Sequence, residues 1–147
     1  MAYHSLVGTA RDESPRVGVE QVSQVSGPAT GRWLVSWQIQ NLGGAPFQIL
    51  TARCPHGKFR SRERELAPAP KLAPGESARI ELPIACDGPP GSVVENAFLI
   101  LRVLWLDKPW QVFARFRVVF AEDGGPETTT ELVTTQRVGF STEEAKL

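Results

Sequence analysis

Two cysteines and one histidine are the side chains of this sequence best suited to bind a transition metal. Cys54 and His56 lie on either side of a proline, and Cys86 ends a later alternating segment. Thiolate and imidazole groups suit zinc or copper, but a structural zinc needs four ligands. Only His4, in a polar N-terminal stretch, is left to complete the set. We therefore keep metal binding by Cys54, His56 and Cys86 as an alternative function, and favour two unligated, partly buried thiols.

The same residues raise two further chemical interpretations. A Cys54–Cys86 disulfide requires an oxidising compartment and a geometry that spacing does not determine. Catalysis by Cys54 with His56 requires a third, orienting group, and none is apparent. The sequence also has no glycine-rich phosphate loop and no Ser-His-Asp spacing. We therefore predict a non-enzymatic protein with no catalytic residue and no cofactor.

A second group of residues places a cation at every second position: Lys58, Arg60, Arg62 and Arg64. On a strand, side chains two apart share a face, so these four residues predict one basic stripe. Such a stripe could bind phosphate groups or an acidic partner. The segment has two interleaved carboxylates and no aromatic side chain that could stack on bases, and charges also protect an edge strand from other sheets. We keep the four residues as anion-binding candidates and favour edge protection.

Composition narrows the class of partner. The 147 residues carry 16 basic and 16 acidic side chains, which gives no general attraction to nucleic acid or to an anionic membrane. The longest apolar run is too short to cross a membrane as a helix. The N-terminal residues lack the pattern of a secretory signal. If Met1 is the native start, we expect a cytoplasmic protein whose cysteines are reduced.

The elements that position these residues are strands. The chain contains 13 glycines and 12 prolines, which fall between alternating apolar segments as turns do in an all-β protein. We predict about seven strands, near residues 16–25, 32–40, 46–53, 58–66, 77–86, 96–106 and 110–120. The first is expected to be bulged, and Pro83 is expected to mark an edge or a bulge. The predicted core includes Trp33, Val35, Trp37, Phe116 and Val118.

The last two segments predict a hairpin joined around Asp107-Lys108-Pro109. Its first strand, NAFLILRVLWL, is apolar on both faces, so one face is left over after the core is filled. Apolar side chains bordered by arginine are typical of protein interfaces, and the alternative is that the two ends of the chain fold back over this face. We therefore predict that the protein binds or assembles with other proteins through the outer face of this hairpin, as a homo-oligomer or in a larger complex. The interface residues are Phe98, Ile100, Arg102, Leu104, Phe113, Arg115 and Arg117.

The order of turns also resembles a known family. Asn41 and Gly43 close an apolar strand, and a Leu-x-Pro-Gly-Glu-Ser turn (72–77) leads into an alternating strand. This order resembles immunoglobulin-like sandwiches of the CARDB type and related bacterial accessory domains. The resemblance covers residues 16–121 and implies a seven-stranded immunoglobulin-like β-sandwich. The resemblance concerns architecture and is weak evidence for function.

The domain organisation follows from this interpretation. We predict a flexible arm over residues 1–15, the sandwich over 16–122, and a linker with a tail over 123–147. The tail contains a run of threonines with strong strand propensity behind a Gly-Pro linker. It can add to a sheet edge, of this chain or of a neighbour, or it can remain disordered.

Overall fold

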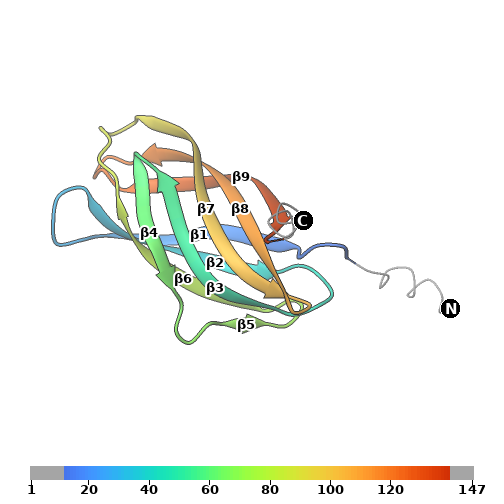
Figure 1. Ribbon diagram of the computed structural model, residues 1–147. Helices are drawn as coiled ribbons and strands as arrows, with labels where there is room; N and C mark the ends of the chain where they lie inside the picture. The colour runs from blue at the N-terminus through green and yellow to red at the C-terminus, as the bar shows by residue number, and fades with distance from the viewer. Residues whose placement is uncertain (1–11, 140–147) are drawn as a thin grey trace.

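The computed structural model describes residues 12–139, which form nine β-strands and no helix (Figure 1). The strands are β1 (Val17–Ser26), β2 (Arg32–Asn41), β3 (Phe47–His56), β4 (Phe59–Glu65), β5 (Lys71–Leu72), β6 (Ser77–Ala85), β7 (Val93–Trp105), β8 (Lys108–Phe120) and β9 (Pro126–Arg137). The all-β prediction is therefore confirmed. No helix in the described part of the chain is long and apolar enough to span a membrane.

The strands form one antiparallel sheet in the order β1-β2-β6-β4-β3-β7-β8-β9, and β5 pairs with β3. Figure 1 shows the strands curving around a single interior, so that β9 returns to the side of β1. The contacts between β1 and β9 that complete the circle come from side chains. Gln21 Oε1 accepts hydrogen bonds from Thr128 N and Thr128 Oγ1, both at 2.7 Å, and Thr130 Oγ1 donates to Val19 O at 2.8 Å. The result is a nearly closed, barrel-like sheet.

This arrangement contradicts the immunoglobulin-like sandwich, which has two separate sheets. Alternating strands suit both architectures, because each has one inner and one outer face. The difference arises from register shifts, which bend strands and increase their twist so that one sheet can curl. Five ladders contain such a shift, at Gln21/Ser23, Ile49/Thr51, Ala52/Cys54, Val94/Ala97 and Arg115/Phe116. The predicted bulge in the first strand is among them, at Val22.

Three stacked and edge-on aromatic rings occupy the middle of the interior. Trp37 of β2 stacks on Phe116 of β8 with ring centroids 5.7 Å apart, and Phe59 of β4 meets both rings edge-on. Val35, Trp37, Phe116 and Val118 are all fully buried, which confirms four of the predicted core residues. Trp33 is half-buried instead, because it lies near the end of the sheet and lines a surface pocket. The inner face of β7 is buried as expected.

The hairpin that joins β7 to β8 turns one residue earlier than predicted. Trp105 pairs with Lys108, so the turn consists of Leu106 and Asp107, and both have positive φ angles of 50° and 63°. Two positive φ angles are the requirement of the type I′ turn, whose twist matches that of paired strands. Pro109 therefore lies within β8, opposite Leu104. The prediction of a turn that includes Lys108 and Pro109 is wrong.

One side of β6 is almost unpaired. β6 pairs with β2 over nine consecutive residues, but its ladder with β4 consists of the single pair Arg60 and Ala85. Pro83 lies two residues from that pair and has no amide hydrogen to donate. Beyond Arg60, the chain of β4 continues along β3 instead of along β6. The sheet thus has a second weak seam, between β6 and β4, three strands away from the seam between β1 and β9.

The predicted arm and tail fall partly outside the described residues. Residues 1–11, which include His4, and residues 140–147 lie there. Within the predicted arm, Asp12 Oδ2 accepts a hydrogen bond from Gly44 N at 2.9 Å. Within the predicted tail, β9 pairs with β8 from Pro126, opposite Phe120, to Arg137, opposite Trp110. Of the alternatives left open for this segment, the structure shows addition to the edge of its own sheet.

Candidate binding surfaces

The predicted interface residues lie together on the outer face of β7 and β8, which we call the hairpin face: Phe98, Ile100, Arg102, Leu104, Phe113, Arg115 and Arg117. Register places Ile100 directly opposite Phe113, and Phe98 directly opposite Arg115. Cross-strand pairs share a face of the sheet, so these residues form one surface. Leu132 of β9, which is 48% exposed and pairs with Arg115, extends it. Leu132 could not be assigned to this face from the sequence, because the pairing of β8 with β9 is not apparent there.

The apolar centre of the hairpin face is partly covered by its own neighbours. Ile100 is only 7% exposed, although its side chain points outward. Ile100 lies opposite Arg53 of β3 on one side and opposite Phe113 of β8 on the other. The long stems of arginine can cover apolar surface while their guanidinium groups stay in water. Phe98, Leu104 and Phe113 remain half-buried, so they present the accessible apolar area of this face.

Two of the three arginines on the hairpin face, Arg115 and Arg117, lie beside a carboxylate, and Arg102 does not. Arg117 Nε lies 3.1 Å from Glu95 Oε2, and Arg115 Nε lies 3.8 Å from Glu131 Oε1. Arg102 is half-buried between Ile100 and Leu104, and the described part of the chain gives it no ion pair. Arg102 therefore brings a positive charge without an ion pair to this face, flanked along β7 by Ile100 and Leu104 and across the neighbouring strands by Thr51 and Gln111.

The predicted basic stripe is interrupted by the register shift in β4. Arg60 pairs with the exposed Pro55, whereas Arg64 pairs with the fully buried Ala52. The regular alternation of the stripe is therefore broken between Arg60 and Arg64. Lys58 is separated from them and lines a different pocket, beside Phe120.

Five arginines nevertheless line one concave surface at the seam between β4 and β6, which we call the arginine cleft: Arg32, Arg53, Arg60, Arg62 and Arg64. Its volume is about 710 Å³, and its floor includes Pro83 and Ala85. The single carboxylate in its lining, Glu63, lies 3.7 Å from Arg53 Nε. Arg32 and Arg53 were not among the predicted anion-binding residues. They reach the cleft through strand pairing, since Arg32 lies opposite Ala85 and Ala85 lies opposite Arg60.

The candidate metal ligands are not gathered into a site. No group of three metal-binding side chains occurs among residues 12–139. Cys54 and Cys86 are both buried and unpaired, and they border different pockets. Burial raises the pKa of Cys54, and burial together with Asp87 raises the pKa of Cys86 to about 11. His56 Nδ1 accepts a hydrogen bond from Lys58 N at 3.0 Å.

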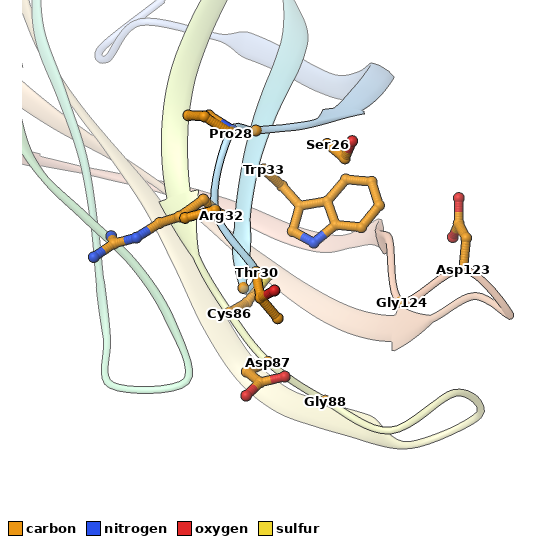
Figure 2. A pocket seen from close by; sticks show the side chains of 13 residues that line it. Ser26, Pro28, Thr30, Arg32, Trp33, Cys86, Asp87, Gly88, Asp123 and Gly124 are labelled. Carbon is orange, nitrogen blue, oxygen red and sulfur yellow. The ribbon is translucent and has the colours of Figure 1, made fainter.

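A smaller pocket of about 370 Å³ lies at the end of the sheet, between the β1–β2 turn and the loops after β6 and β8 (Figure 2). Figure 2 shows the indole ring of Trp33 between Ser26 and Asp123, with Arg32 pointing away from the ring. Asp123 Oδ1 already accepts a hydrogen bond from Gly125 N at 2.9 Å. Much of the remaining wall is the backbone of glycine-rich turns. The pocket therefore offers an aromatic surface without a convergent set of reactive groups.

Comparison with known proteins adds little to this description. No protein-family model matches the chain, and no curated protein matches it. One solved structure that it resembles is described as "X-ray structure of Northeast Structural Genomics Consortium target SoR45". The match covers 86% of this chain and 87% of that chain, with 14% sequence identity and a TM-score of 0.25. Agreement this low supports no inference about fold or function.

Proposed function

We propose that this protein is a non-enzymatic binding subunit that docks a different protein on its hairpin face. The observation that supports the proposal is Arg102, a half-buried cation without an ion pair among the described residues, which lies between the apolar Ile100 and Leu104 on β7. β9 extends the sheet beside β8, so it does not cover this surface. A partner that covers the surface removes apolar area from water and can supply the missing negative charge.

The charge of the hairpin face favours a different protein over a second copy of this chain. A symmetric dimer uses the same surface patch on both subunits. When such a dimer is centred on the hairpin face, it brings the two Arg102 side chains together. Arg115 and Arg117 would also approach their copies, although each has a carboxylate of its own. Like charges at an interface oppose association, so we infer a partner that offers a carboxylate between apolar side chains.

The proposal is tested first by the mass of the purified full chain in solution. We expect light scattering to give the monomer mass over a range of protein concentrations. A dimer that Leu104→Glu converts to monomer would overturn the proposal in favour of self-association. Circular dichroism of the variant checks that the sheet is retained.

The second test measures binding by a partner that has been isolated with the wild-type chain, identified and purified. We expect Arg102→Glu and Leu104→Glu each to weaken the reconstituted complex at least about tenfold, because each replaces a complementary contact by a repelled or desolvated carboxylate. Val25→Glu is the matched control, since Val25 is 58% exposed on β1, outside the hairpin face. Equal affinities for wild type and the two hairpin-face variants would show that this face is not the docking surface.

A further inference from the structure

The arginine cleft contains an excess of positive charge in a protein whose total charges balance. Five arginines and one glutamate line it, whereas the whole sequence has 16 basic and 16 acidic residues. Among the described residues, Arg32, Arg60, Arg62 and Arg64 form no ion pair. Arginines held close together repel one another unless a ligand supplies negative charge. The cleft is therefore suited to a ligand with several negative groups.

The cleft also coincides with the seam where sheet pairing stops. β4 and β6 pair only at Arg60 and Ala85, so the facing sides of these two strands have no further ladder between them. An exposed strand edge can pair with an extended polypeptide, and side chains at the edge then determine which sequence binds. An acidic polypeptide fits both properties of the seam, its open edge and its arginines.

Nucleic acid fits the cleft less well. Proteins that bind single strands combine basic grooves with aromatic side chains on which bases stack. The lining of the arginine cleft contains no aromatic residue. Its apolar members, such as Pro55, Pro83 and Ala85, are small and offer no stacking surface.

The cleft is continuous with the hairpin face through one residue. Arg53 lines the cleft, and the register of β3 and β7 places Arg53 directly opposite Ile100. A bound segment that leaves the cleft across β3 would therefore reach Phe98 and Phe113. This continuity suggests that one partner covers both surfaces, an interpretation that rests on the proposed function.

We propose that the arginine cleft binds an extended, carboxylate-rich segment of a partner protein. Arginine is suited to this role because its planar guanidinium group binds a carboxylate through two parallel hydrogen bonds. Arg32, Arg60, Arg62 and Arg64 are all exposed and none is engaged by a carboxylate of the described chain. The test uses Arg60, which forms the single β4–β6 pair, together with Arg62, two residues further along the same strand.

The test uses the full chain and a fluorescein-labelled peptide of ten glutamates, followed by fluorescence anisotropy. We expect saturable binding that weakens as salt increases, and a loss of about tenfold or more in affinity for the double variant Arg60→Glu, Arg62→Glu. The matched control is Lys71→Glu with Lys108→Glu, which changes net charge equally at exposed lysines outside the cleft. An equal loss in both double variants would overturn the proposal, because it would show a nonspecific charge effect.

Two further probes distinguish the class of ligand. A ten-residue thymidine oligonucleotide that binds more tightly than the peptide, and depends on Arg60 and Arg62, would overturn the proposal in favour of nucleic acid. Displacement of the peptide by equimolar inorganic phosphate would show a simple anion site and would also overturn it. Leu104→Glu separates the two proposals, since we expect it to leave peptide binding unchanged even if it abolishes docking on the hairpin face.

Discussion

Burial controls the chemistry of both cysteine side chains. Cys54 is fully buried and Cys86 is 5% exposed, and the pKa of each thiol is raised. Thiolate, and not thiol, is the nucleophile and the metal ligand, so a raised pKa suppresses both activities at neutral pH. This behaviour agrees with the interpretation of these residues as small apolar side chains.

The raised pKa of Cys86 predicts a pH dependence of stability. Its pKa is about 11 in the folded protein, against 9.0 for the ordinary thiol. Between these two pH values the folded state therefore binds more protons than the unfolded state. The stabilising contribution is complete below pH 9 and is lost as the pH rises through 11. The free energy of unfolding, measured in urea, should fall between pH 8 and pH 10.5. We expect this fall to be smaller for Cys86→Ala than for the wild type. Equal losses would contradict the prediction.

Single residues also show where sequence patterns are informative. The polar Asn41 was predicted to close a strand, and it is 1% exposed. Its side-chain amide donates to Ala45 O and Leu72 O, each at 2.9 Å, and accepts from Gly43 N at 2.9 Å. An Asn-x-Gly pattern predicts the local turn, because asparagine bonds nearby backbone. The bond to Leu72 is long-range, so no local pattern predicts it.

Among the elements, β1 and β9 are joined in an unusual way. Gln21 of β1 takes the place of ladder bonds, since its amide accepts two hydrogen bonds from Thr128 and donates to Pro126 O at 3.0 Å. Thr128 Oγ1 also lies 3.3 Å from Trp37 Nε1, which links the seam to the core. Gln21 therefore makes most of the hydrogen bonds that hold the end of the sheet against its beginning, and the bond from Thr130 Oγ1 to Val19 O adds to them.

This role predicts that Gln21→Ala is destabilising by about 2 kcal/mol, since a typical intramolecular hydrogen bond contributes about 1 kcal/mol and several are lost. The matched control is Gln38→Ala, because Gln38 is exposed and, among the described residues, its side chain has one hydrogen bond, to Ser77 Oγ at 3.3 Å. We expect that substitution to change stability by less than about 0.5 kcal/mol. The difference is measured by denaturant unfolding, and similar values for the two variants would show that Gln21 does not secure the seam.

The strands themselves were largely predictable, but their assembly was not. Alternation of apolar side chains located segments that correspond to β2, β6 and β8, because one face of each is buried and the other is not. Only the bulge of the first strand was predicted. The other register shifts add a residue to one strand without a distinctive composition, so the pattern did not indicate that the sheet would curl. The two-residue β5 is too short for any alternation to appear.

At the level of the whole molecule, two weak seams divide the sheet into β1-β2-β6 and β4-β3-β7-β8-β9. The rings of Trp37, Phe59 and Phe116 come from both parts and contact one another across the interior. Aromatic pairs of this kind contribute beyond the area that they bury. The core therefore connects the two parts more extensively than the backbone ladder does.

We accordingly expect the molecule to unfold in one cooperative transition. Far-ultraviolet circular dichroism and tryptophan fluorescence should give the same midpoint in urea, and Phe59→Leu should lower both midpoints together. The physical reason is that loss of either part exposes the rings of the other. Two separated transitions, or a shift of only one probe, would show that the seams divide the protein into independent units.

The candidate surfaces were predictable only in part for the same reason. The hairpin face could be located because its two strands are neighbours in the sequence, and local pairing determines its register. The arginine cleft combines β2, β3, β4 and β6, whose pairing depends on contacts far apart in the chain. The alternating cations of the sequence predicted three of its five arginines, Arg60, Arg62 and Arg64. Arg32 and Arg53 are identified only when the order of strands in the sheet is known.

The side-chain seam between β1 and β9 has a consequence for the connectivity of the fold. Thr128 lies against Gln21 and Thr130 against Val19, so the two strands run antiparallel, as the arms of a hairpin do. The start of β1 and the end of β9 therefore lie at the same end of the sheet. A linker between them would join the two ends of the chain into a circle. New termini could then be made by cutting the chain at the exposed Gly57 turn. The fold is thus suited to circular permutation, in which an opening at Gly57 leaves the hairpin face intact and places the new termini beside Pro55 and Arg60, at one edge of the arginine cleft.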